Sequence, residues 1–460
     1  MSAPVSSISF EEVPSQPCSR TQTHTLDRFD LIVLVLFALS VFAVAKLPVA
    51  PKKFGDGDFD LGARNIAAAL KHEGTWSSIR VYRLPGAIAY YTIPYLFVPV
   101  SAAPESFWLA GVSWNMLWLA VMTLLLRRAG EQLAGPLAGQ IAAVASLLSP
   151  FAIYYAFSIT AETPAYIGAV LTAYGSLRWL RLRPQAWFTR ELGITVAGLS
   201  LMMLSRTNIV LLLPIMLIGA LVAIRTDGIA SFRFAFLCSA ATGLVMLAVT
   251  ALILALPSAK PQAQTDNLIF VAYQGRFQFR TQPWDWRFWQ DYPGRTDYED
   301  YWSSLQNLRA ESQKTGVSLS TLQLKWIVDD FRHHPINTLK MSAIRVLSID
   351  TEIAASRSPH EFVLGPLQGP LAFWLFHIVV NAVNYLALAL SAGFIYIYRD
   401  RVSAYWLWGP WIAIVVFHAM VYAEPRYLLP ARPGLLLMSS AVVACYFTVN
   451  SRSYLQRAAS

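Results

Sequence analysis

Long apolar segments alternate with short polar connections along most of the chain. A transmembrane helix needs roughly 20 mostly apolar residues, and ten segments meet that requirement: about 30–50, 105–126, 135–153, 159–177, 190–205, 208–224, 233–256, 371–398, 404–422 and 427–448. The pattern predicts an all-α polytopic membrane protein, a bundle of about ten transmembrane helices. Two long segments, residues 51–104 and 257–370, fall between the predicted spans.

Composition supports this class. Of 460 residues, 55% are hydrophobic and only 14% are charged, which lies outside the range of ordinary soluble proteins. The net charge of +9 comes largely from arginines in short connections, so it reports topology and indicates no nucleic-acid partner. Cys18, Cys238 and Cys445 are too far apart for a disulfide framework or a metal site of the usual spacing. No glycine-rich phosphate loop is present in the sequence.

The arginine clusters orient the predicted spans. Pairs or groups occur at Arg127 and Arg128, between Arg178 and Arg190, at Arg225 and Arg233, and at Arg399 and Arg401. All fall on one side of the span count, which the positive-inside rule assigns to the cytoplasm. We therefore expect cytoplasmic tails at residues 1–28 and 449–460, a transmembrane module at 29–256 with its first outer loop at 51–104, a non-cytoplasmic cap at 257–370, and C-terminal transmembrane helices at 371–448.

The second outer segment is rich in aromatic residues between Phe270 and Trp302. They predict either a small folded cap at the membrane interface or a surface that stacks on sugars or lipids. The cap region ends in HPINTLKMSAIRVLSI, where Pro335 suits a first helical position. Apolar residues then recur at helical spacing, which predicts an amphipathic helix lying in the interface: Ile336, Leu339, Ala343, Val346 and Leu347.

The first outer loop carries GDGDFDLGARN, with three aspartates in five positions. Asp60 and Arg64 are four residues apart and can pair on the helix that the following apolar residues indicate. Asp56 and Asp58 precede that pair in a glycine-rich turn. There they can serve as helix caps, as metal ligands or as a general base.

Further charged residues fall near the outer ends of predicted spans. Arg83 precedes an LPG turn, Glu162 lies near the start of the fourth span, Arg206 ends the fifth, and Glu424 and Arg426 open the tenth. Charges at membrane depth are costly and tend to mark pathways or sites. Any one of these residues can be a snorkelling side chain or half of a helix–helix ion pair. Because all of them fall on the same side of the predicted membrane, together they indicate a functional site.

Together these motifs carry a family resemblance. The acidic turn with GDGDFDLGARN, then RLPG, SPFAIYYAFSITAE, SRTN, the HP helix and EPRYLLP resemble the integral-membrane GT-C glycosyltransferases. The resemblance is nearest to their bacterial protein-mannosyltransferase-like branch, which includes the aminoarabinose and galacturonic acid transferases of lipid A. It covers about residues 30–448. Two positions depart from the family pattern, namely Leu84 in RLPG and Pro425 between Glu424 and Arg426.

The resemblance implies roles for several residues. It makes Asp56 the catalytic base, with Asp58 as the rival, and it places Arg83 and Arg426 near a lipid phosphate. Glu424 and Tyr427 belong to the same late motif as Arg426. It also implies inversion at the anomeric carbon. Mg²⁺ or Mn²⁺ held by Asp56, Asp58 and Glu162 is an alternative, since carboxylate oxygens suit these ions.

The chemistry of the residues points the same way. An active face outside the cytosol has no ready supply of cytosolic nucleotide sugars, so a polyprenyl-phosphate sugar arriving through the bilayer fits. Arg83, Arg206 and Arg426 suit its phosphate because guanidinium binds phosphate oxygens bidentately. We expect transfer to a glycolipid, glycan or protein acceptor at the extracytoplasmic face of a bacterial inner membrane. The alternative is a flippase for the same lipid-linked sugar, which would bind the phosphate without chemistry.

Overall fold

The computed structural model describes most of the chain, with gaps in the tails and in several connections. The described residues are 26–46, 57–76, 85–184, 186, 188–206, 209, 211–227, 229–255, 262–278, 296–347, 363–364, 366–397, 405–421 and 425–459. Asp56, Arg83 and Glu424, three of the predicted site residues, lie outside them.

The described chain is almost entirely helical. Its first ten helices are α1 Arg28–Ala45, α2 Gly57–Leu70, α3 Pro85–Tyr95, α4 Pro104–Ala134, α5 Pro136–Leu148, α6 Phe151–Ala156, α7 Glu162–Leu182, α8 Arg190–Ser205, α9 Leu212–Asp227 and α10 Ile229–Leu254. The remaining elements are α11 Gln262–Gly275, α12 Thr296–Thr315, α13 Leu319–His333, α14 Pro335–Leu347, the hairpin β1 Val363–Leu364 and β2 Leu367–Gln368, α15 Gly369–Ile397, α16 Tyr405–Met420, the 3₁₀ helix η7 Pro425–Ala431 and α17 Arg432–Ala459.

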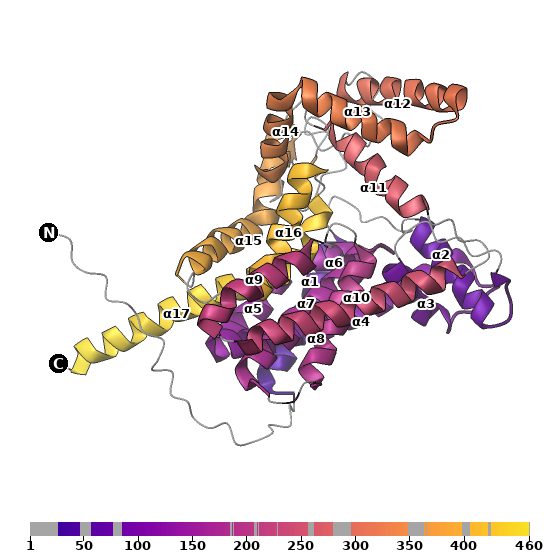
Figure 1. Cartoon of the computed structure of the whole chain (residues 1–460). Coiled ribbons are helices and arrows are strands. Elements are labelled where there is room, and N and C mark those ends of the chain that lie inside the picture. Colours follow the sequence, from indigo (N-terminus) through magenta and orange to yellow (C-terminus); the bar gives the residue numbers. More distant parts are fainter. Residues whose placement is uncertain are drawn as a thin grey trace.

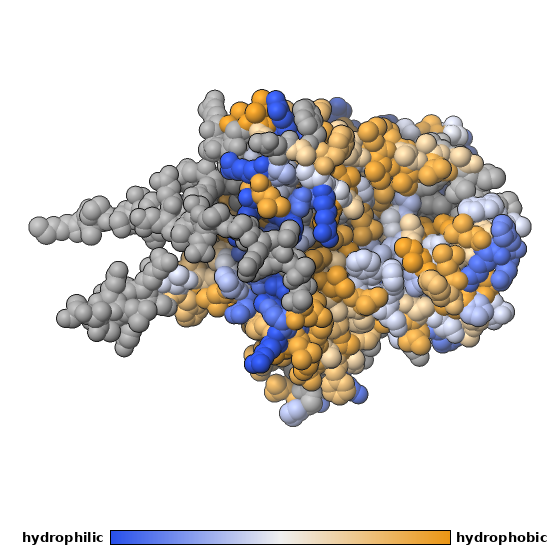
Figure 2. Space-filling view, turned by 90° about the horizontal axis from the view of Figure 1, so that it is seen from below, coloured by the Kyte–Doolittle hydropathy of each residue, from blue (hydrophilic) through white to orange (hydrophobic). Residues whose placement is uncertain are grey.

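The predicted all-α membrane bundle is confirmed, since each of the ten predicted apolar segments forms helix. Five helices within the described residues are long and apolar enough to cross a membrane, namely Arg28–Ala45, Pro104–Ala134, Ile229–Leu252, Gly369–Tyr396 and Tyr427–Thr448. Large apolar side chains such as Leu39, Leu247 and Val379 point outward from three of them. Figure 2 shows the result as a broad apolar band across the middle of the molecule, with hydrophilic residues to its left. Such a surface suits contact with lipid.

The elements are arranged with the cap at one end. Helices α12, α13 and α14 lie at the upper end of the view in Figure 1, and α17 runs away from them toward the lower left. Helix α11 leads from the bundle into this group, while α2 and α3 lie together at the right. The long helices between these two regions form the transmembrane bundle.

One expectation about the connections is wrong. Arg127 and Arg128 lie inside α4, which continues to Ala134 instead of ending near residue 126. Their guanidinium groups are paired with carboxylates: Arg127 with Asp27 at 2.7 Å and with Asp30, and Arg128 with Asp30 at 2.8 Å. The pairs join the start of α1 to α4. Because acidic residues contribute little to the positive-inside rule, the predicted orientation is unaffected.

The cap helices surround a small core of their own. It is built from buried side chains of α11 to α13 and the turn after α11: Tyr273, Phe277, Tyr301, Leu305, Leu308 and Leu322. Three of the aromatic residues noted in the sequence therefore have a packing role, which supports the folded-cap interpretation for them.

The amphipathic helix begins at Pro335, as predicted. Its predicted apolar stripe faces away from the protein, because Ile336 and Leu339 are 79% and 67% exposed. The opposite face, with Met341, Ile344 and Arg345, is buried. An exposed apolar stripe beside a membrane bundle is the arrangement expected of an interfacial helix.

Candidate active site

The predicted site residues Glu162 and Arg206 form an ion pair. Glu162 is the first residue of α7, and Arg206 is the C-cap of α8. Glu162 is only 1% exposed, so its carboxylate is desolvated and requires a cation or hydrogen-bond donors as partners. The two helices are antiparallel neighbours, and this arrangement brings the start of one to the end of the other.

Glycines allow α7 and α8 to pack closely enough for that pair. A Cβ atom added to Gly168 would lie 2.5 Å from the carbonyl oxygen of Gly198, and one added to Gly175 would lie 2.5 Å from Thr195 Oγ1. Neither site can accept a side chain without separating the helices. Small residues at such crossings are the usual means by which membrane helices approach each other.

Tyr427 completes a group of three predicted residues. The Cζ atom of Arg206 lies 4.7 Å from the centre of the Tyr427 ring, a cation–π contact. The rings of His418 and Phe417, at the end of α16, lie 5.8 Å and 6.4 Å from the Tyr427 ring. Glu162, Arg206 and Tyr427 are far apart in the sequence, and their contacts join α7, α8 and η7.

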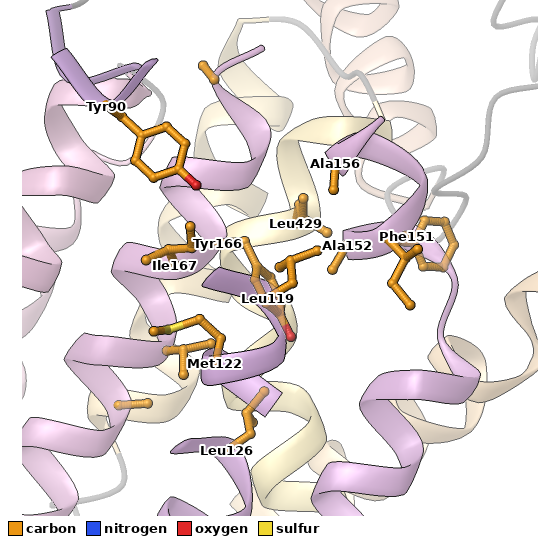
Figure 3. Packing of buried hydrophobic residues seen from close by; sticks show 14 of the residues in the cluster. Tyr90, Leu119, Met122, Leu126, Phe151, Ala152, Ala156, Tyr166, Ile167 and Leu429 are labelled. Carbon is orange, nitrogen blue, oxygen red and sulfur yellow. The ribbon is translucent and has the colours of Figure 1, made fainter. Parts of the chain in front are cut away.

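The core beneath this group is well packed. Figure 3 shows Leu429 of η7 beside Ala152 and Ala156 of α6, with Leu119 and Tyr166 close by. Leu429 is 1% exposed. Burial of these side chains fixes η7, and with it Tyr427, against the start of α7.

Non-helical backbone leads into Glu162. Residues 157–161, between α6 and α7, are mostly buried, so their carbonyl groups require hydrogen-bond donors. Trp108 Nε1 donates to the carbonyl oxygen of Phe157 at 3.0 Å, and Tyr91 Oη donates to that of Thr160 at 3.0 Å. Asn115 Nδ2 donates to the last carbonyl of α6, that of Ala156, at 2.9 Å. Trp108, Asn115 and Tyr91 were not among the predicted site residues, although an asparagine within an apolar span was a usable signal.

In the first outer loop, the predicted ion pair between Asp60 and Arg64 is present. Asp60 has a second partner, because Tyr95 Oη donates to its Oδ1 at 2.7 Å. Burial, together with the neighbouring Asp60 carboxylate, raises the pKa of Tyr95, so its hydroxyl remains a donor. Arg64 Cζ lies 4.7 Å from the ring of Phe107. Asp60 thus connects α2 to α3 by a hydrogen bond, and Arg64 connects α2 to α4 by its contact with the Phe107 ring.

Helices α2 and α3 pack against each other. A Cβ on Gly62 would lie 3.1 Å from Ile88 Cδ1, and further along Lys71 Nζ donates to the carbonyl oxygen of Tyr95 at 3.1 Å. At the start of α3, a Cβ on Gly86 would lie 2.6 Å from the backbone of Leu204. The α3 N-terminus therefore lies against the end of α8, two residues before Arg206.

The remaining predicted residues are placed only by their neighbours in the chain. Asp58 is the second residue of α2, and Arg426 precedes Tyr427 in η7, but the structure describes neither side chain. Asp56 directly precedes α2, and Arg83 is two residues before α3. Helix α3, which follows Arg83, begins at the end of the bundle that holds Glu162 and Arg206, and α2, which follows Asp56, packs against α3.

The metal alternative stays a prediction. Within the described part of the chain, no three His, Cys, Asp or Glu side chains lie close enough to hold an ion. Of the three proposed ligands, Glu162 is paired with Arg206. The side chains of Asp56 and Asp58 lie outside the described part of the chain.

No protein-family model and no curated protein matches the sequence. Among solved structures, the fold is similar to that of archaeal oligosaccharyltransferase AglB from Archaeoglobus fulgidus in complex with an inhibitory peptide and a dolichol-phosphate. The TM-score is 0.51 at 13% identity over 94% of this chain. Two further structures of the oligosaccharyltransferase of that organism, the apo form and a form tethered to an acceptor peptide, give TM-scores of 0.46 and 0.49 at 12% and 13% identity, over 93% and 94% of this chain.

The chain spans about half of those proteins, 52%, 52% and 51% of their lengths. At 13% identity the likeness to the first establishes the fold and nothing finer. The fold is the helical membrane bundle that the sequence motifs implied, similar in its arrangement to that of the archaeal oligosaccharyltransferase. The protein-mannosyltransferase-like branch and the resemblance to lipid A transferases stay predictions.

Proposed function

We propose that this protein is a membrane glycosyltransferase that moves a sugar from a polyprenyl-phosphate donor to an acceptor on the non-cytoplasmic face. The observation that carries the proposal is the meeting of Glu162, Arg206 and Tyr427 at the end of the bundle where α3 begins. The neighbouring fold adds support, since the archaeal oligosaccharyltransferase was solved with a dolichol-phosphate and an inhibitory peptide.

The arrangement suits a phosphate that gains negative charge as the sugar leaves. Helix N-termini carry unpaired N–H groups and a partial positive charge. Helix α7 begins at Glu162, the partner of Arg206, and α3 begins against the backbone of Leu204, two residues before Arg206. Arg83 and Arg426 would add two guanidinium groups to that of Arg206. Cations placed where charge develops lower the barrier more than they strengthen ground-state binding.

Arg206 can pair with Glu162 and still bind phosphate, because a guanidinium has five N–H donors. Its pairing with Glu162 and its stacking on Tyr427 hold the side chain in one orientation before the donor arrives. Preorganisation of this kind reduces the free-energy cost of ordering the site during the reaction. Glu162 is thus proposed as a positioning residue for Arg206.

The transfer step is a single displacement. Asp56, or Asp58 as the alternative, accepts the proton of the acceptor hydroxyl from within about 3 Å. The hydroxyl oxygen forms a bond to the anomeric carbon, and the bond from that carbon to the phosphate oxygen breaks. Polyprenyl phosphate leaves with the bonding electron pair, and the anomeric configuration inverts.

The proposal is tested by incubating purified protein with a panel of polyprenyl-phosphate sugars and with glycolipid, glycan or peptide acceptors. We expect free polyprenyl phosphate to appear together with glycosylated acceptor for at least one pair. The flippase alternative predicts that every donor is recovered intact. Recovery of intact donor throughout, by a protein that binds it, would reject the transferase.

A further inference from the structure

A fully buried arginine connects the cap to the bundle. Arg345 of α14 is 0% exposed, and its guanidinium donates to three backbone carbonyl groups and one hydroxyl. Its Nε donates to the carbonyl oxygen of His418 at 2.9 Å, its Nη1 to that of Gly275 at 2.6 Å, and its Nη2 to that of Ala419 at 2.8 Å. Nη2 also donates to Ser342 Oγ at 3.1 Å.

These carbonyl groups belong to the ends of two helices. His418 and Ala419 lie in the last turn of α16, which ends at Met420, and Gly275 is the last residue of α11. The last carbonyls of a helix have no partner within it and carry partial negative charge, so one cation can satisfy several of them. Ser342 Oγ also donates to Ala419 O at 2.7 Å. Helix α14 is therefore hydrogen-bonded to the end of α16 through Arg345 and Ser342.

A second arginine joins the other cap helices to α14. Arg276 Nε donates to Asp330 Oδ2 of α13 at 2.8 Å, and its Nη2 donates to Thr338 Oγ1 of α14 at 2.5 Å. Arg276 follows α11 directly. The two contacts of Arg276 therefore link α11, α13 and α14 into one unit. Arg345 attaches that unit to α16.

The end of α16 in turn supports the candidate site. His418 is 0% exposed, and within the described residues neither ring nitrogen has a hydrogen-bond partner. Its ring is held by packing and by its own backbone, which Arg345 fixes. That ring lies against Tyr427, and Tyr427 lies against Arg206. The contacts thus run without a gap from Arg345 in the cap to Arg206 in the site.

We propose that Arg345 is a positioning residue through which the cap sets the place of Tyr427, and so of the Arg206 guanidinium. The inference rests on the proposed function for its effect on turnover, but the structural link stands separately. Complete burial keeps Arg345 from touching substrate. The proposal couples the position of the cap to donor phosphate binding in the bundle.

The test compares Arg345→Lys with Lys340→Gln, an exposed position on the same helix. Lysine keeps the charge but offers one ammonium in place of a fork that reaches four acceptors. We expect kcat to fall about 10-fold or more for Arg345→Lys, since small displacements of site groups have effects of that order. Lys340→Gln should keep wild-type kcat. Ser342→Ala, a milder change at the same junction, should shift kcat in the direction of Arg345→Lys.

A double-mutant cycle with Tyr427→Leu separates positioning from simple loss of stability. If Arg345 acts through the Tyr427 ring, the double variant should turn over no more slowly than Tyr427→Leu alone. Multiplying effects in the double variant would overturn the proposal.

Hydrogen exchange gives a readout that needs no activity. Arg345→Lys, and Ser342→Ala to a smaller extent, should speed amide exchange in residues 425–431, whereas Lys340→Gln should not. Exchange that changes only in the cap would overturn the link. A wild-type protein that transfers no sugar would count against the proposed function alone, because the exchange comparison still decides the link.

Discussion

At the scale of single residues, the three aspartates of the first outer loop have different environments. Asp60 is bound by Arg64 and Tyr95, which gives it a structural role. Asp56 precedes α2 and Asp58 lies in its first turn, and α2 packs against α3, which begins beside the end of α8. A helix cap and a catalytic base make opposite predictions for these two positions.

We expect Asp56→Asn to lower transfer by roughly 100-fold or more, because it keeps the shape and removes the proton acceptor. Asp60→Asn should retain most turnover and cost about 1 kcal/mol of stability, as expected when a charged hydrogen-bond partner becomes neutral. Initial rates and thermal unfolding of the purified variants measure both effects.

Asp58→Asn separates the remaining possibilities. Loss of transfer with Asp58→Asn and full activity with Asp56→Asn would move the base by two residues. A new requirement for added Mg²⁺ or Mn²⁺ would favour a metal held by this turn. Full activity of both variants would leave only a helix cap.

The arginines provide a second residue-scale prediction. Arg83→Ala and Arg426→Ala should each weaken donor use by about 2 kcal/mol, the order expected for a lost charge-assisted contact. Arg181→Ala, at the exposed far end of α7, is the matched control and should have little effect. Competition binding of polyprenyl phosphate measures the difference. Equal losses in all three would indicate damage to folding.

Arg206→Ala should behave differently from those variants. Removing it leaves the Glu162 carboxylate buried without the cation that pairs with it. Breaking a buried pair in this way costs about 3–5 kcal/mol. We therefore expect Arg206→Ala to lose stability as well as donor use, and thermal unfolding should separate it from Arg426→Ala.

At the scale of elements, the sequence predicted the helices better than their interruptions. Hydropathy separates the segment at 135–153 from the one at 159–177, but it does not show that the first is divided into α5 and α6. Pro150 is a local sign of that division. The carbonyl groups between α6 and α7 are satisfied by Trp108, Asn115 and Tyr91, which donate from other helices, and such partners are invisible to a local pattern.

The pairing of site residues shows the same limit. Asp60 and Arg64 are one helical turn apart, so their ion pair follows from spacing alone. Glu162 and Arg206 pair because α7 and α8 form an antiparallel hairpin, which the short connection at 183–189 allows. The stacking of Arg206 on Tyr427 depends on how η7 packs against α7, and no sequence pattern gives that.

The crossing of α7 and α8 offers a test at this scale. A Cβ on Gly198 would lie 2.6 Å from both Gly168 O and Thr172 N, so Gly198→Val must push the helices apart. We expect a loss of about 1–3 kcal/mol of stability and a larger loss of turnover, because Glu162 and Arg206 separate.

The matched control is Gly193→Ala on the same helix, where an added Cβ meets nothing within 4 Å. It should be neutral or stabilising by up to about 1 kcal/mol. If Gly198→Val kept wild-type turnover, the helix crossing would not position the site.

At the scale of the whole molecule, the account depends on topology. The account requires that one face of the protein lies away from the cytosol, on the side of the membrane that has no supply of nucleotide sugars. That face includes the acidic loop, the cap and the end of the bundle that holds Glu162. Single cysteines at Ser77 and Ser303 should react with an impermeant reagent added outside intact cells, and one at Gln185 should not. The three native cysteines are replaced first. Reversed labelling would place the acidic loop in the cytosol and remove the argument for a lipid-linked donor.

The fold and the site support one central claim, that a lipid-linked sugar is cleaved and transferred at the outer end of the bundle. The most direct measurement is the stoichiometry of turnover in proteoliposomes carrying a radiolabelled polyprenyl-phosphate sugar, with acceptor supplied at the non-cytoplasmic face. We predict one polyprenyl phosphate released for each acceptor glycosylated, and none released by Asp56→Asn above background. Intact donor that appears in the opposite leaflet, without release of polyprenyl phosphate, would contradict the account and identify a flippase.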